Sequence, residues 1–142
     1  MQNLSYSISY PIRKSREEVF RAIVDPAILT SYFPKTASGF FENGVTLLWT
    51  WDRESAEFTV AHVTPNERIE GHWQAYGVDY EVETIFELKT REDSVTIVTI
   101  SERGFHDDDK GHIASYAQCS GWTDFLLCLR ARLEHNIDLR QF

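Results

Sequence analysis

Apolar and polar residues alternate along much of the chain with a period of two. From Leu4 to Tyr10 every second residue is large and apolar, and a serine stands between each pair. This alternation predicts a half-buried strand that ends at Pro11. The same period returns at residue 45 and continues to residue 101, interrupted by short polar turns. It is clearest over 80–88, where one face is apolar and the other is mostly glutamate.

Two short segments after the first strand carry helix signals. Ser15 followed by Glu18 is a capping box, in which each residue satisfies a backbone N–H of the other. It predicts a short helix that ends near Asp25. Asp25 and Pro26 then provide an N-cap and a first helical residue for a second, brief helix.

Near the end of the chain the spacing of apolar residues changes to three and four. That spacing is typical of one face of a helix. The residues that form this stripe are Tyr116, Cys119, Trp122, Leu126, Leu129 and Leu133. We expect this long helix to begin between Asp107 and Ile113 and to end near Asp138.

The order of these elements predicts an α+β fold. Short connections between successive strands indicate antiparallel pairing, in one curved sheet of about six to seven strands. One face of such a sheet needs cover, and the final helix is the only element large enough to supply it. A length of 142 residues is that of a single domain, which we expect to cover 1–142.

Composition and charge narrow the range of possible functions. The net charge of the chain is −8, and a net negative charge does not attract phosphates. This argues against binding to nucleic acids or anionic membranes. The longest purely apolar run, Phe125 to Leu129, is far shorter than the roughly 20 residues of a membrane span. The first residues do not have the pattern of a signal peptide. We therefore expect a cytoplasmic protein.

Three segments in this order resemble a known family. They are 16–23 with Asp25-Pro26 and Tyr32-Phe33, then 60–69 followed by Trp73, and finally Gly121-Trp122 with Leu126, Leu129 and Leu133-Glu134. They resemble the helix-grip fold of the START-like (SRPBCC) superfamily. Within it, the chain is similar to the branch of the activator of heat-shock protein 90 ATPase homologues. Only Gly44 stands where that branch often has paired glycines.

The resemblance implies a cavity between the sheet and the long helix, which holds apolar ligands in some members and performs catalysis in others. Aromatic residues make up 13 % of the chain, enough to fill a core or to line such a cavity. The candidates for its lining are Trp49, Trp51, His62, Trp73, Tyr80 and Tyr116. We expect Trp122 to be structural, and Gly121 to let the helix approach the sheet closely.

The leading hypothesis is a binding protein for a small apolar or aromatic molecule. One alternative is a cyclase- or hydrolase-type enzyme that uses the same cavity. Another is a protein-interaction module, co-chaperone-like, with a protein partner or a second copy of the chain as its target.

No catalytic residue is assigned. His62 and His72 are the best acid–base candidates, with solvent-facing side chains as the alternative for both. The segment from His106 to His112 is rich in aspartate but contiguous, so we expect no metal and no cofactor. Cys119 and Cys128 would lie about 13 Å apart along a helix, too far for a disulfide.

Overall fold

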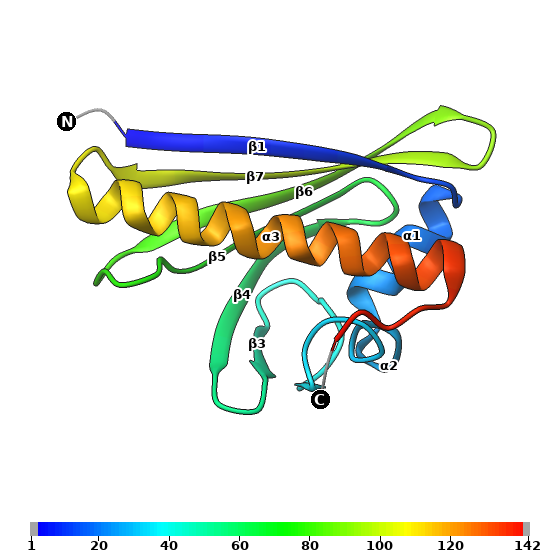
Figure 1. The fold of residues 1–142 in the computed structure, drawn as a ribbon, viewed down its shortest axis with the longest axis horizontal. Coiled ribbons are helices and arrows are strands. Elements are labelled where there is room, and N and C mark those ends of the chain that lie inside the picture. The colour runs from blue at the N-terminus through cyan, green and yellow to red at the C-terminus, as the bar shows by residue number, and fades with distance from the viewer. Residues whose placement is uncertain (1–2, 141–142) are drawn as a thin grey trace.

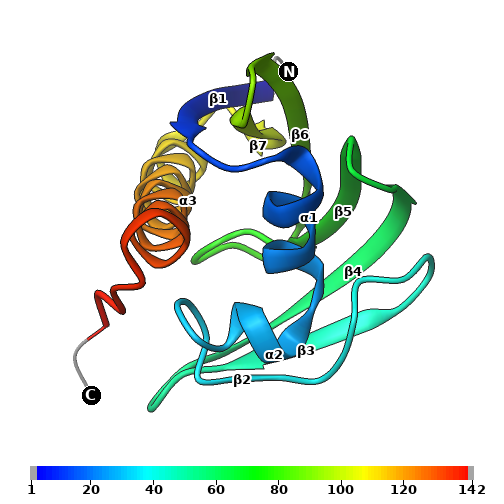
Figure 2. The same cartoon turned by 90° about the vertical axis from the view of Figure 1, so that its right-hand side faces the viewer.

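The computed structural model describes residues 3–140. Its elements follow the chain as β1 (Asn3–Ile12), α1 (Arg16–Val24), α2 (Pro26–Leu29), β2 (Thr36–Ala37), β3 (Thr46–Thr50), β4 (Ser55–Thr64), β5 (Arg68–Gln74), β6 (Glu81–Glu92), β7 (Val95–His106) and α3 (Asp109–His135). The strands form one antiparallel sheet in the order β1-β7-β6-β5-β4-β3-β2, and α3 runs along its concave face (Figures 1 and 2). The predicted α+β helix-grip fold is confirmed.

Local signals set the ends of the helices. The Ser15 hydroxyl accepts a hydrogen bond from the Glu18 N–H at 3.2 Å, and the Asp25 carboxylate accepts one from the Ala27 N–H at 2.9 Å. At the start of α3 the Asp108 carboxylate caps the Gly111 N–H at 2.7 Å. The predicted starts of all three helices are therefore confirmed. The final helix ends earlier than expected, because Asn136 adopts a left-handed conformation that caps it.

The first strand runs through Pro11 to Ile12 instead of ending there. β1 is an edge strand and pairs only with β7, so a missing N–H can face away from the ladder. Strand β2, which pairs with β3, was not predicted, because two residues are too few to show a periodic pattern.

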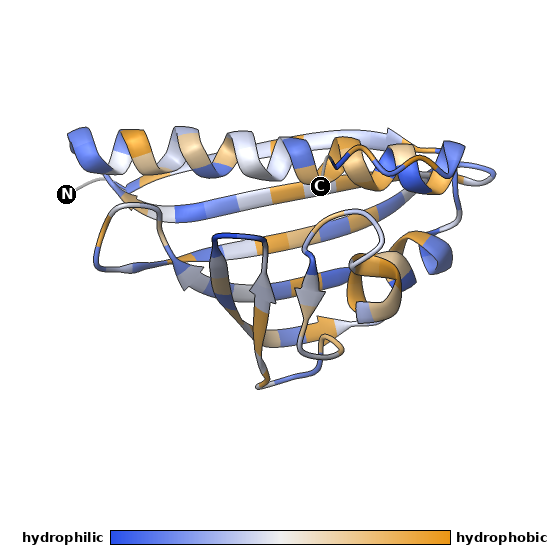
Figure 3. Ribbon diagram, turned by 60° about the horizontal axis from the view of Figure 1, so that its bottom comes forward, coloured by the Kyte–Doolittle hydropathy of each residue, from blue (hydrophilic) through white to orange (hydrophobic). Residues whose placement is uncertain are grey.

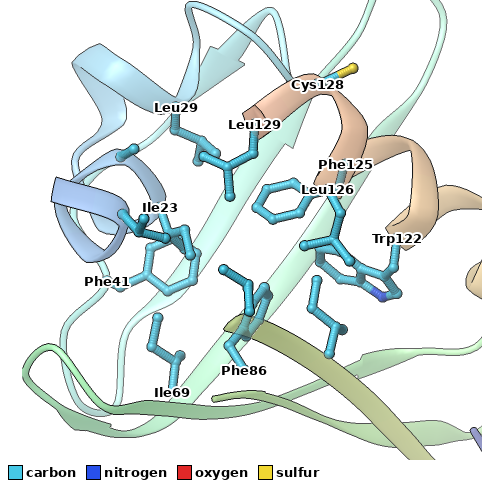
Figure 4. Close-up of a cluster of buried hydrophobic side chains, with 14 of the residues drawn as sticks. Ile23, Leu29, Phe41, Ile69, Phe86, Trp122, Phe125, Leu126, Cys128 and Leu129 are labelled. Carbon is cyan, nitrogen blue, oxygen red and sulfur yellow. The ribbon is translucent and has the colours of Figure 1, made fainter. Parts of the chain in front are cut away.

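The core lies between α3 and the sheet (Figure 4). Trp122 is 2 % exposed, and its ring centroid lies 5.3 Å from that of Trp73, 5.2 Å from that of Phe86 and 5.4 Å from that of Phe125. α1 and α2 close one end, between α3 and the curved strands β3 and β4 (Figure 2). Orange and blue residues alternate along the strands, as the period of two predicts (Figure 3).

The sheet splits near its middle, and this split positions the site. β4 and β5 pair only as far as Thr59 opposite His72, although β4 begins at Ser55 and β5 continues to Gln74. Beyond that pair the β3–β4 hairpin bends away from the β5–β6 hairpin (Figure 1). The separated ends leave a space that α3 crosses.

Candidate functional site

A cavity of about 880 Å³, partly open to solvent, occupies the space between the two hairpins and α3. Aromatic side chains from four parts of the chain line it: Phe33, Trp51, Trp73, Tyr76 and Trp122. Residues of α3 form another wall, with Gly121 and Gln118 among them. The cavity therefore depends on the divergence of β4 and β5 and on the side chains that α3 presents to it.

Neighbouring groups hold the aromatic walls in place. The Trp51 indole N–H donates to the Phe33 carbonyl at 3.1 Å, and the two rings meet edge to face with centroids 5.5 Å apart. Trp73 packs against Trp122 with centroids 5.3 Å apart. These contacts fix the orientation of the rings before any ligand is bound.

A buried carboxylate lies directly behind this wall. Glu102 of β7 is 1 % exposed. Its Oε2 accepts hydrogen bonds from the Trp73 indole N–H at 2.7 Å and from the Thr84 hydroxyl at 2.6 Å. Its Oε1 accepts from the Tyr6 hydroxyl at 2.5 Å and from the Gln118 amide at 2.9 Å. With two donors on each oxygen, the group acts only as an acceptor, as an ionised carboxylate does.

The hydrogen bonds of Glu102 extend to the rim of the cavity. The Gln118 side chain uses its remaining oxygen to accept the Tyr76 backbone N–H at 2.6 Å, which ties the β5–β6 connection to α3. Burial raises the pKa of Tyr6 well above its usual range, and the charge and hydrogen bond of Glu102 raise that pKa further. Tyr6 therefore stays a neutral donor to Glu102.

Two of the six residues predicted from the sequence lie on the cavity wall, Trp51 and Trp73. Trp49 is 1 % exposed and belongs to the core, where its ring stacks on Phe58 with centroids 5.9 Å apart. Trp51 lies just beyond the end of β3, two residues after Trp49 and nearer the turn of the hairpin at which the cavity opens.

The other three predicted residues lie elsewhere. His62 is exposed on β4. The Tyr80 hydroxyl accepts the His106 backbone N–H at 2.9 Å, and its ring stacks on the His106 ring at 3.8 Å. Tyr116 is 67 % exposed on α3. The structure does not bring these three side chains to the cavity.

The stripe that includes Tyr116 mispredicts the first half of α3. The buried residues there are Gly111, Ala114, Ser115 and Gln118, which are small or polar. Gln118 is buried because it completes the hydrogen bonds of Glu102. An inward carboxylate on the sheet thus draws a polar residue to the helix face, and hydrophobic periodicity cannot detect such a pair.

The expectation for Gly121 is also wrong. A Cβ atom at this position would meet nothing within 4 Å, so the glycine does not serve a close approach of helix and sheet. Gly121 lies on the cavity wall, where the absence of a side chain leaves space.

The remaining candidates for chemistry have structural partners. His72 pairs with Glu81 at 3.1 Å, and His112 pairs with Asp107 at 3.0 Å. Within residues 3–140, no group of three or more His, Cys, Asp or Glu is arranged to hold a metal ion. Burial raises the pKa of the Cys128 thiol to about 11, and the nearby Asp124 carboxylate contributes, so the thiol stays protonated. None of the helices described is long and apolar enough to cross a membrane.

Solved structures share this architecture. The protein SSP2350 from Staphylococcus saprophyticus is 24 % identical, with 96 % of each chain covered and a TM-score of 0.79. The Aha1 dimer from Colwellia psychrerythraea is 23 % identical, with 95 % of this chain and 98 % of that one covered and a TM-score of 0.75. DynU16, from the dynemicin biosynthetic locus, is 22 % identical with a TM-score of 0.82, and the match covers 96 % of this chain but 49 % of that one.

At these identities the solved structures establish the fold. A comparison with curated proteins found no match. The family model described as Activator of Hsp90 ATPase homolog 1-like protein matches residues 13–134, which include every element from α1 to nearly the end of α3. The chain therefore belongs to the family of Activator of Hsp90 ATPase homolog 1-like proteins.

Proposed function

We propose that this protein binds a small apolar or aromatic molecule in the cavity between the sheet and α3, as a single-domain protein of the cytoplasm. The observation that carries the proposal is the set of fixed aromatic walls around a volume of about 880 Å³. Small-molecule sites commonly have volumes of about 300–1,000 Å³ and mostly apolar walls with a few polar groups. Gln118 and Tyr76 supply such polar groups at the rim.

Binding is favoured over catalysis by the groups that reach the cavity. A cyclase or hydrolase would need an acid or base in contact with its substrate. None of the five histidines lines the cavity as described, and the four carboxylates of its lining are exposed to solvent. Glu102 is covered by its four donors, so a substrate in the cavity would meet Trp73 and Gln118 instead.

A partner protein is the weaker alternative for this chain. One family member has been solved as a dimer, which favours self-association as a further property of the fold. In the present chain the exposed large apolar residues are dispersed over the loop before β3, β3 itself, the β5–β6 connection, α3 and the C-terminal segment. A cavity with rigid aromatic walls points instead to a small ligand.

Gly121 offers a direct test. Gly121→Leu would place a side chain in the cavity without meeting another atom at its Cβ, so the fold should persist. Gly121→Ala is the matched control, since it adds helix propensity but little volume. Titration with 2-naphthylmethanol, followed by tryptophan fluorescence excited at the red edge or by calorimetry, should give saturable binding to the wild type and to Gly121→Ala. We expect at least a roughly tenfold weaker affinity for Gly121→Leu. Equal affinity of all three proteins, or no binding to the wild type, would refute the proposal.

A further inference from the structure

We infer that the cavity selects an organic cation, an aromatic or apolar body that carries an ammonium or similar group. This inference rests on the proposed function, since it names the class of ligand for the same site. It is carried by the charge of the cavity lining and by the buried carboxylate behind it.

The lining carries charges of only one sign. Its ionisable residues are the carboxylates Glu54, Glu57, Glu81 and Asp124, and it includes no lysine, arginine or histidine. Glu81 has a partner in His72. The ion pairs formed between described residues leave the other three carboxylates without a basic partner. An anionic ligand would meet uncompensated negative charge there, and a cation would relieve it.

Glu102 is an independent source of negative charge. All four of its hydrogen-bond donors are neutral, and no cationic side chain pairs with it among residues 3–140. Because Glu102 is buried, salt screens its charge much less than that of an exposed carboxylate. Two of the four donors, Trp73 and Gln118, are themselves part of the cavity wall. The field of this carboxylate therefore extends into the cavity.

The hydrogen bond from the Trp73 indole N–H to Glu102 makes the Trp73 ring a better surface for a cation. Indole attracts cations to its face through the ring quadrupole, more strongly than phenyl or phenol rings do. A carboxylate that accepts the indole N–H adds electron density to the ring and places a full negative charge at its edge. A ligand cation over Trp73 would thus gain from the ring, from Glu102 and from the rim carboxylates together.

Three probes with one body and different charges test the inference. They are 2-naphthylmethyltrimethylammonium, 2-naphthylmethanol and 2-naphthoate, titrated by isothermal calorimetry into the wild-type protein at low salt. We expect the cation to bind about tenfold more tightly than the alcohol, and the carboxylate to bind more weakly than both. Raising the salt concentration to about 300 mM should weaken the binding of the cation and leave the affinity for the alcohol unchanged.

A triple variant, Glu54→Gln with Glu57→Gln and Asp124→Asn, removes the unpaired rim charges. It should reduce the preference for the cation over the alcohol without abolishing it, because Glu102 and the Trp73 ring remain in place, and it should leave the affinity for the alcohol unchanged. The matched control removes three exposed carboxylates that do not line the cavity, with Glu17→Gln, Glu42→Gln and Asp93→Asn. This control has the same net charge as the triple variant and should keep the preference for the cation.

The outcomes separate the two proposals. If the alcohol binds the wild type and the cation binds no more tightly, the inference is overturned while the proposed function stands. The inference is also overturned if the control loses the preference as fully as the rim variant, because net charge alone would then explain it. If none of the three probes binds the wild type, the proposed function fails and the inference fails with it.

Discussion

Glu102 shows at the scale of one residue how polar and apolar packing are combined in this core. Its replacement Glu102→Gln keeps the size but puts an amide nitrogen where an oxygen accepted two donors. The Tyr6 and Thr84 hydroxyls can reverse their roles, but the Trp73 indole is only a donor. The Gln118 amide cannot reverse without losing its bond to Tyr76. Whichever of the two oxygens the amide nitrogen replaces, one donor would therefore remain unsatisfied: the Trp73 indole in one orientation and the Gln118 amide in the other.

We therefore expect Glu102→Gln to lower the free energy of unfolding by about 1–3 kcal/mol, the cost of a buried unsatisfied group. Urea denaturation measures it. Thr84→Val, which removes one donor and leaves the carboxylate intact, should cost about 1 kcal/mol. A Glu102→Gln variant as stable as the wild type would show that these hydrogen bonds do not hold the wall of the cavity.

Tyr32 makes stability depend on pH in the alkaline range. It is fully buried, its hydroxyl donates to the Ala22 carbonyl at 2.9 Å, and burial raises its pKa well above the usual value. An unfolded tyrosine ionises near pH 10. Since the folded pKa is higher, this stabilisation is complete below about pH 10 and is lost as the pH rises above it. Tyr6 contributes with the same sign.

The urea midpoint should thus fall above about pH 10. In Tyr32→Phe that fall should be smaller, although the variant loses about 1 kcal/mol at neutral pH with its hydrogen bond. Parallel pH profiles of the two proteins would show that Tyr32 does not titrate on unfolding.

At the scale of the element, α3 has its apolar anchor at Trp122. The side chain is surrounded by the rings of Trp73, Phe86 and Phe125, among others. Trp122→Ala should cost about 3–5 kcal/mol, which is a large part of the roughly 5–15 kcal/mol that stabilises a domain. Tyr116→Ala, an aromatic truncation on the exposed side of the same helix, should change stability by less than about 0.5 kcal/mol. Chemical denaturation measures the free energy of unfolding of both variants. A loss below about 1 kcal/mol for Trp122→Ala would contradict the packing described.

The elements themselves could be predicted from the sequence because their signals are local. The capping residues Ser15, Asp25 and Asp108 sit beside the helices that they start, and alternation over 80–88 needs no knowledge of the fold. Strand β2 and the buried face at the start of α3 could not be predicted in this way. Both depend on partners far away in the sequence.

The whole molecule determines the cavity, which explains why only part of its lining was predicted. The divergence of β4 and β5 beyond Thr59 and His72 has no local signature, so alternation could not separate Trp49 in the core from Trp51 at the cavity. Phe33 and Trp122 reach the same space from a loop and from α3. Glu102 had a detectable signal, since it continues the inward series of Val98 and Ile100. The predicted strand stopped one residue too early to include it.

The expectation that the protein needs no metal can also be tested on the whole molecule. The Asp108 carboxylate caps α3, and Asp107 pairs with His112, so this segment has structural roles without an ion. Treatment with a chelator should leave the melting temperature unchanged. A clear decrease that added Zn²⁺ or Ca²⁺ reverses would instead identify the segment from His106 to His112 as a metal site.

The central claim, that a small molecule occupies the space between the split sheet and α3, is tested most directly by nuclear magnetic resonance of the four tryptophan indole N–H groups. Each gives its own signal, and each has a defined place: Trp51, Trp73 and Trp122 line the cavity, whereas Trp49 lies in the core. During titration with 2-naphthylmethanol, the first three signals should shift along saturable curves with one common dissociation constant, and the Trp49 signal should shift less. Unchanged indole signals at saturating probe, or shifts confined to Trp49, would contradict the account.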